Sequence, residues 1–128
     1  MSERTSGRCR DPRDLQVFQK ARELAGEIIR VTDKFPKSEV HGSVSQMRRA
    51  AFSIASTIAE GYRRCSKKDI LRFLKIAFGS CGELDAQFLI SRDVGWVKDD
   101  DFSRIELKVK EVSRRLWRLM EAVEAIPD

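Results

Sequence analysis

The sequence predicts an all-α protein, an antiparallel up-down four-helix bundle that assembles as a homo-oligomer. Apolar residues recur three and four positions apart over four long stretches, and no stretch alternates as a half-buried strand does. The connections between the stretches are short, which favours antiparallel neighbours. The third stretch is apolar over more than one face. Because such a helix is buried on more than one side, we expect the protein to associate with copies of itself.

The 128 residues are enough for one domain with its own hydrophobic core. Residues 1–13 are polar and basic, so we expect a disordered arm there and the bundle over residues 14–126. No apolar run approaches the ~20 residues that span a bilayer, and the N-terminus lacks the apolar centre of a secretory signal. We therefore expect a cytoplasmic protein without a membrane partner.

The first helix is expected over residues 14–33, with Asp14 as its N-cap. It ends before Pro36, because a proline pushes the preceding residue out of the α conformation. The second helix is expected over residues 44–63 and is rich in small residues, which let a neighbouring helix approach closely. A line of polar residues along it is either a wet surface or a half-buried polar seam. This line consists of Arg49, Ser53, Ser56, Glu60 and Arg63.

The third helix is expected over residues 67–93, with Ser66 as its N-cap. Glycine weakens the interior of a helix, yet this one contains Gly79 and Gly82 on either side of Ser80. We expect these small residues to pack closely against the small residues of the second helix. The widened apolar arc of the third helix supplies the predicted oligomer interface. The interface residues are Leu71, Phe73 and Phe78.

The fourth helix is expected over residues 99–125, where three aspartates at its start complement the helix dipole. Its apolar stripe alternates three and four positions apart without a break. Three arginines in its second half either extend a basic surface or pair along the helix with nearby glutamates, and pairing is the favoured interpretation. The arginines are Arg114, Arg115 and Arg118, and the glutamates are Glu111 and Glu121.

Positive charge is concentrated in residues 45–75, which carry eight lysines and arginines against two acidic residues. Such a region attracts nucleic acid, RNA or DNA, or an acidic protein partner, whereas the plainer interpretation is a solvated helix face. The predicted nucleic-acid-binding residues are Arg48, Arg49, Arg63, Arg64, Lys67, Lys68 and Arg72. The alternative function is a protein-interaction scaffold or an accessory subunit for an acidic protein partner.

No set of residues in the sequence predicts catalysis. His41 is the only histidine and lies in an expected loop, which gives poor support to a zinc or di-iron site. No phosphate-binding or nucleophile motif occurs. Cys9, Cys65 and Cys81 are odd in number and widely spaced, so free thiols are favoured over a disulfide framework. We expect a protein that is not an enzyme and needs no cofactor or metal.

Four motifs in the central part of the chain resemble those of one family. RRAA, IAEG, RFL and GS-x-x-EL occur together and in this order within residues 46–84. In this combination they resemble the bacterial four-helix-bundle proteins encoded in intervening sequences of large-subunit ribosomal RNA genes. The resemblance runs from Asp14 to about Met120. The accessory protein of diversity-generating retroelements is similar in fold.

The resemblance implies a four-helix bundle that assembles as a homopentameric barrel and has a nucleic-acid-associated role. The retroelement relative binds nucleic acid and its reverse transcriptase through basic surface. Three places depart from the family pattern: Thr57 stands where Asn is common, Arg63 where Gly is common, and Cys81-Gly82 where larger or alanine-type residues are usual. The positions that match are Arg48, Arg49, Glu60, Gly61, Arg72, Phe73, Gly79, Ser80 and Glu83.

Overall fold

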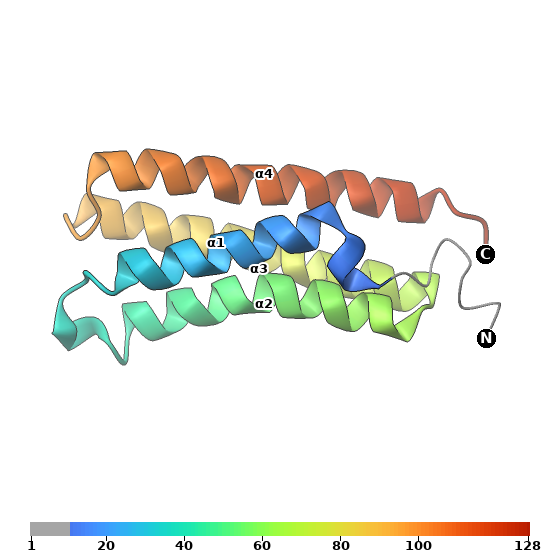
Figure 1. The fold of residues 1–128 in the computed structure, drawn as a ribbon, viewed down its shortest axis with the longest axis horizontal. Helices are drawn as coiled ribbons and strands as arrows, with labels where there is room; N and C mark the ends of the chain where they lie inside the picture. Colours follow the sequence, from blue (N-terminus) through green and yellow to red (C-terminus); the bar gives the residue numbers. More distant parts are fainter. Residues whose placement is uncertain (1–10) are drawn as a thin grey trace.

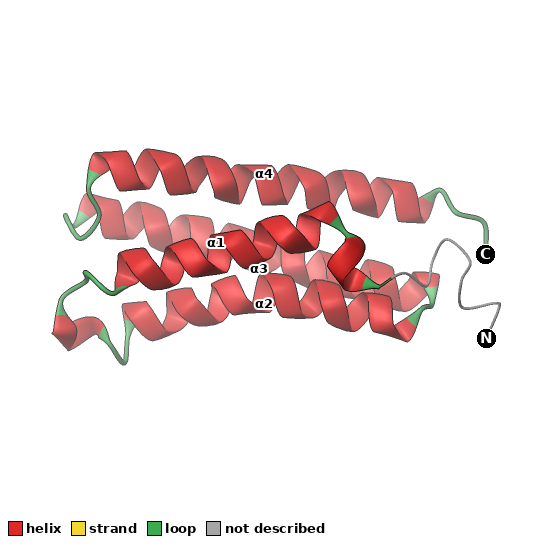
Figure 2. Cartoon of the chain, in the orientation of Figure 1, coloured by secondary structure: helices red, strands yellow, loops and turns green. Residues whose placement is uncertain are grey.

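The computed structural model describes residues 11–128, and its four long helices lie lengthwise beside one another (Figure 1). Their bounds are α1 Gln16–Thr32, α2 Ser43–Arg64, α3 Lys67–Asp93 and α4 Asp99–Glu124. Two short 3-10 helices, η2 (Pro12–Asp14) and η3 (Lys37–Glu39), precede α1 and α2. No strand occurs among the described residues (Figure 2). The prediction of an all-α protein with four helices is confirmed.

The links between successive helices lie at alternating ends of the molecule. The α1–α2 and α3–α4 links are at one end, and the α2–α3 link is at the other, near both ends of the described chain (Figure 1). Each helix packs against two others, since contacts join α1 to α2, α2 to α3, α3 to α4, and α4 back to α1. Within residues 11–128, no helix is both long enough and apolar enough to cross a membrane.

The start of the chain differs from the prediction. Residues 1–10 of the expected arm lie outside the described residues, but Pro12 is buried and opens η2, where its fixed φ suits a first helical turn. Asp11 caps η2 by accepting a hydrogen bond from the Arg13 backbone N–H. Asp14 therefore belongs to η2, and α1 follows Leu15 without a side-chain cap. The prediction that Asp14 caps the first helix is wrong because this extra turn separates the two.

One apolar core runs through the centre of the bundle. Each helix contributes residues at three- and four-residue spacing that are almost fully buried, as the apolar periodicity predicts. The rings of Phe88 and Phe102 stack with centroids 5.3 Å apart and join α3 to α4 near their shared link. Examples of fully buried side chains are Leu24, Ile28, Ile54, Ile58, Ile70, Leu84, Ile105 and Leu116.

Small residues bring α2 and α3 together at two levels. A Cβ atom on Gly61 would lie 2.8 Å from the Phe73 Cβ, so only glycine permits this approach. Ser80 is buried and donates a hydrogen bond to the Ser53 hydroxyl at 3.0 Å, as expected for a polar seam that is partly closed. Gly79 and the other expected packing glycine, Gly82, are instead exposed, and a Cβ atom on either would meet nothing within 4 Å. The prediction that these two glycines pack against α2 is wrong, because both turn away from it.

Candidate nucleic-acid interface

A two-residue link sets the geometry of the most basic end of the bundle. Cys65 adopts a left-handed conformation (φ 63°) that ends α2. Ser66 then caps α3, as predicted, because its hydroxyl accepts a hydrogen bond from the Asp69 N–H at 3.1 Å. The link is so short that the last turn of α2, with Arg63 and Arg64, adjoins the first turn of α3. Cations from both helices therefore gather at this end.

Arg64 and Arg72 flank one aromatic ring at this end. Their guanidinium carbons lie 5.0 and 4.5 Å from the centroid of the Phe73 ring. Arg64 also pairs with Glu60 at 3.1 Å, and Arg72 with Asp69 at 3.7 Å. Both arginines are exposed, so solvent screens the two ion pairs and the arginines keep donors for another ligand. The Arg64–Glu60 pair lies at the surface, so this part of the polar line on α2 is the wet surface of the two alternatives.

Lys67 is occupied within the chain. Its ammonium group donates to the Ile126 carbonyl oxygen at 2.6 Å and pairs with Asp128 at 3.3 Å. The Lys67 side chain is only 14% exposed. This lysine therefore holds the C-terminal tail against the start of α3 and offers little to a ligand. No local sequence pattern predicts this contact, because the hydrogen-bonded partners are separated by 59 positions.

Arg63 and Lys68 are the accessible cations of this end. Both are exposed, and neither forms an ion pair among residues 11–128. Hydrogen bonds from Arg13 lower the pKa of Asp11, and the charge of Arg63 makes a smaller contribution in the same direction. Arg63 thus lies near the beginning of the described chain. We call Arg63, Arg64, Lys68 and Arg72 together the basic end.

Arg48 and Arg49 lie elsewhere on α2. Fifteen residues separate Arg48 from Arg63, which corresponds to about 22 Å along a helix. The Arg48 guanidinium donates to the Thr32 hydroxyl at 2.9 Å and to the Ile29 carbonyl at 3.1 Å. Its role is to bind the C-terminal turn of α1. Arg49 is exposed and has no ion pair within the described chain. The seven predicted binding residues are therefore divided between two places.

The three predicted interface residues do not share one face of α3. Phe73 contacts Gly61 of α2, whereas the ring of Phe78 lies 5.7 Å from that of Trp117 on α4. Leu71 is half-buried against the core. The apolar residues that α3 exposes most are others, Ile90 at 60% and Ile76 at 43%. The sequence does not distinguish Ile76 and Ile90 from the other apolar residues of α3. It does not reveal which part of the broad apolar arc the neighbouring helices α2 and α4 cover.

The two cysteines within the described residues behave differently. Cys81 is a free thiol in the core, and its burial raises its pKa to about 11. Such a thiol is protonated at neutral pH and is a poor nucleophile. Cys65 is disulfide-bonded, so the prediction of free thiols is wrong at this position. Its place next to the basic end does not make it a reactive group.

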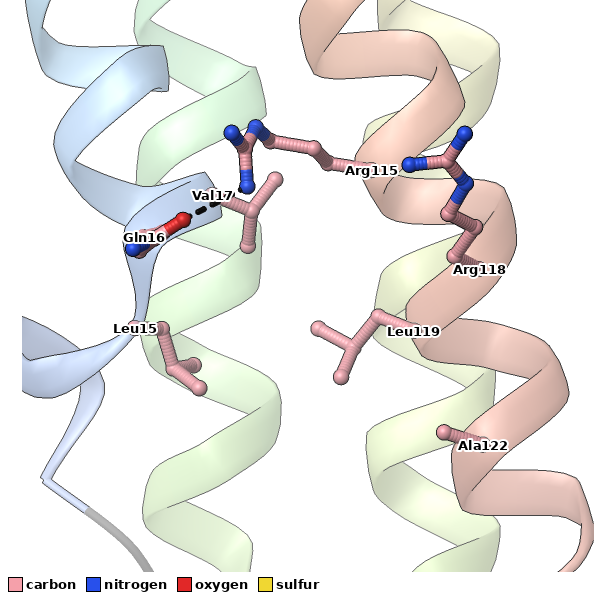
Figure 3. A pocket seen from close by; sticks show the side chains of 7 residues that line it. All are labelled: Leu15, Gln16, Val17, Arg115, Arg118, Leu119 and Ala122. Carbon is pink, nitrogen blue, oxygen red and sulfur yellow. Dashed lines mark hydrogen bonds between the residues drawn. The ribbon is translucent and has the colours of Figure 1, made fainter.

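A hollow of about 290 Å³ lies between the start of α1 and the second half of α4 (Figure 3). Leu15 and Leu119 line its apolar part from the two sides. Arg115 reaches across to the Gln16 side-chain oxygen at 2.7 Å and also pairs with Glu111 at 3.2 Å. Pairing along the helix, the favoured interpretation, is thus right for Arg115. Arg114 and Arg118 form no ion pair in the described part of the chain.

Comparisons with known proteins agree with the four-helix architecture. The family model for the 23S rRNA-intervening sequence protein matches residues 13–118. A crystal structure of a protein with unknown function from the S23 ribosomal protein family of Bacteroides thetaiotaomicron superposes with a TM-score of 0.75. It is 19% identical, and the match covers 82% of this chain and 95% of that chain, so it shows a shared fold. A search of curated proteins finds no match. Since the matched range covers most of its length, the chain belongs to the 23S rRNA-intervening sequence protein family.

Proposed function

We propose that the protein is a non-catalytic, homo-oligomeric bundle, antiparallel and up-down, whose basic end binds nucleic acid. The observation that carries this proposal is the pair of exposed cations at the α2–α3 link, Arg63 and Lys68, which form no ion pair among residues 11–128. Unpaired surface cations displace the counterions condensed on the phosphates of a nucleic acid, and this release gives sequence-independent affinity.

The Arg64–Phe73–Arg72 stack supports a phosphate-bearing ligand. Each guanidinium lies over the Phe73 ring, which limits the orientations that its side chain samples. A planar, preorganised guanidinium suits bidentate binding of a phosphate. The carboxylates of Glu60 and Asp69 already hold one edge of each arginine, so a phosphate need only take the other. An acidic protein would use the same cations, and nuclease treatment distinguishes the two ligands.

The outer face of α3 supports self-association. Gly79 and Gly82 are exposed in the middle of a long helix, and each costs about 1 kcal/mol of helix stability relative to alanine. Ile76 and Ile90 are exposed on the same helix. A second copy that packs its backbone close to this face would account for both features. The family resemblance implies five copies, and such a ring would multiply the affinity of one modest basic end.

The binding proposal is tested by fluorescence anisotropy with labelled RNA and DNA at low salt. We expect Arg63→Glu/Lys68→Glu to weaken binding at least tenfold and to reduce the salt slope by roughly two, because two phosphate contacts are lost. The matched control is Lys37→Glu/Lys98→Glu, which makes the same charge change on exposed residues at the opposite end. Native gels and circular dichroism establish that both variants fold.

Two results would contradict the binding proposal: no binding by the unmodified protein, or equal weakening by both double variants. If a protein partner stays bound after nuclease treatment and is lost with Arg63→Glu/Lys68→Glu, the basic end serves an acidic protein instead. Self-association is measured separately by light scattering, where a monomer of 14.7 kDa at micromolar concentration would exclude it.

A further inference from the structure

We propose that a second surface, on α3 and α4, binds unpaired bases of single-stranded nucleic acid by stacking. This surface, the aromatic–arginine patch, consists of Phe78, Ser113, Arg114, Trp117 and Arg118. The inference rests on the proposed nucleic-acid binding and adds to it a separate site and a class of ligand. None of these residues belongs to the basic end.

The patch presents an aromatic surface to solvent. Trp117 is 54% exposed and Phe78 is 36% exposed, although large aromatic side chains usually gain most from burial. Their rings pack at an interplanar angle of 47°, so each steadies the other while the Trp117 side chain stays exposed. A hollow of about 360 Å³ adjoins the pair and is walled by Ser113, Arg114 and Arg118. A flat, apolar ring can enter this hollow and stack.

The charges around the patch favour an anionic ligand. Arg114 and Arg118 lie one helical turn apart, are exposed, and form neither an ion pair nor a hydrogen bond within residues 11–128. Arg115, between them in sequence, donates to Gln16 of α1 and pairs with Glu111 of its own helix. On α4, the arginine that reaches α1 is therefore paired, whereas the two arginines beside Trp117 form no ion pair in the described chain. Glu121, one turn further along α4, is exposed and bounds the patch on that side.

A line of lysines connects the patch to the basic end. Lys68 and Lys75 are two helical turns apart on α3, and Phe78 follows one turn later. Both lysines are exposed and lack an ion pair in the described chain. From Lys68 to Phe78 the track is about 15 Å long, at 1.5 Å per residue. A basic track with an aromatic platform is the arrangement by which proteins hold single strands, with phosphates on the cations and a base on the ring.

A single strand fits the patch better than a duplex or a second copy of the chain. The bases of a duplex are already stacked on one another, so none is free to lie on Trp117. Another copy docked here would bury two arginines that have no ion-pair partner in the described chain, which is costly. The exposed apolar residues of α3 that are proposed for self-association, Ile76 and Ile90, are not among those that line this hollow.

The test uses Trp117 as its own reporter. Trp96, the other tryptophan, packs against Phe35 at the far end of the bundle, and Trp96→Phe leaves Trp117 as the single emitter. We expect an oligo(dT) or oligo(U) of about twelve nucleotides, within the site sizes of known single-strand binders, to quench Trp117 fluorescence. A duplex of the same length should leave it unchanged. The two oligonucleotides distinguish DNA from RNA as the preferred strand.

Affinity for the single strand is then measured for Trp117→Ala in the otherwise unmodified chain. Loss of one stacked base should weaken binding roughly 5- to 150-fold, since base–aromatic stacking contributes about 1–3 kcal/mol. The matched control is Phe52→Ala, which removes a ring that is 56% exposed on α2. We expect Arg114→Gln/Arg118→Gln to weaken binding as well and to lower its salt dependence, and this second variant retains the tryptophan.

The inference is overturned if the strand binds but neither Trp117→Ala nor the arginine variant weakens it more than Phe52→Ala does. It is also overturned if Trp117→Ala changes the oligomer mass and leaves affinity intact, since the patch would then be an interface between copies. Failure of the unmodified protein to bind any nucleic acid would instead remove the proposed function itself. The two failures are therefore distinguishable.

Discussion

Gly61 lies where α2 packs tightly against α3. Its neighbours are the backbone of Ile70 and the Cβ of Phe73, neither of which is the mobile end of a long side chain. A methyl group there must push the helices apart or distort α3. Because Phe73 in turn supports Arg64 and Arg72, this contact also positions the basic end.

We predict that Gly61→Ala destabilises the protein by about 1–3 kcal/mol, because overpacking outweighs the better helix propensity of alanine. The measurement is urea unfolding followed by circular dichroism. Gly26→Ala is the matched control, since the nearest atoms to its new methyl group would be the flexible guanidinium of Arg30, at 3.3 Å. That change should be neutral or stabilising by up to about 1 kcal/mol. Equal unfolding midpoints for the two variants would contradict the close approach.

At the scale of elements, one side chain joins the end of α1 to the start of α2. Thr32 donates its hydroxyl to the Ile28 carbonyl at 2.6 Å, and the same oxygen accepts a hydrogen bond from Arg48. Arg48 also donates to the Ile29 carbonyl, which accepts the Asp33 backbone N–H at 3.1 Å as well, so it adds a bond to the last turn of α1. An arginine at a helix C-terminus gains further from the helix dipole. Arg48 matches the family pattern, and these contacts give it a structural role that requires no ligand.

We predict that Arg48→Ala costs about 1–3 kcal/mol in the free energy of unfolding and changes nucleic-acid affinity less than about twofold. The stability cost follows from hydrogen bonds of a charged donor to half-buried acceptors. Arg49→Ala removes the adjacent arginine, which is exposed and unpaired within residues 11–128, and should be nearly neutral for stability. Chemical denaturation and anisotropy on the same samples measure both effects. A large loss of nucleic-acid affinity with unchanged stability would contradict this prediction and show that Arg48 contributes to binding.

At the scale of the whole molecule, the most exposed apolar residue of α3 lies far from the basic end. Ile90 follows Lys68 by 22 positions on the same helix, which corresponds to about 33 Å. Between them, the open positions Gly79 and Gly82 offer a smooth surface for another copy. Contact between copies over the second half of α3 would leave the basic end accessible in the assembly. Self-association and binding are therefore expected to respond to different substitutions.

We predict that Ile90→Glu dissociates the oligomer without unfolding the monomer, because a charge is costly in an interface and harmless on a side chain that is 60% exposed. Light scattering should fall toward the 14.7 kDa of one chain. Leu107→Glu places the same charge on α4 at a residue that is 68% exposed and should keep the native mass. If both variants lose the oligomer, or if neither does, the interface between copies is not specifically at Ile90.

Local features of the sequence determined the helices of this protein and its family. The three- and four-residue apolar spacing specified four helices, Ser66 specified the start of α3, and the order of the central motifs identified the family. These features are encoded within one or two helical turns, or in a short run of residues, so the linear sequence reveals them. The same holds for the pairing of Arg115 with Glu111, four positions away.

Only the tertiary structure decided which side chains are free to bind. Lys67 and Arg48 look like accessible cations in sequence, but partners 59 and 16 positions away occupy them. Trp117 follows the buried Leu116 directly in the sequence, yet it stays at the surface next to two arginines that are unpaired in the described chain. The physical reason is that burial and ion pairing depend on which helix faces are in contact. Periodicity fixes the apolar face of each helix, whereas the packing of its two neighbours fixes how much of the rest remains exposed.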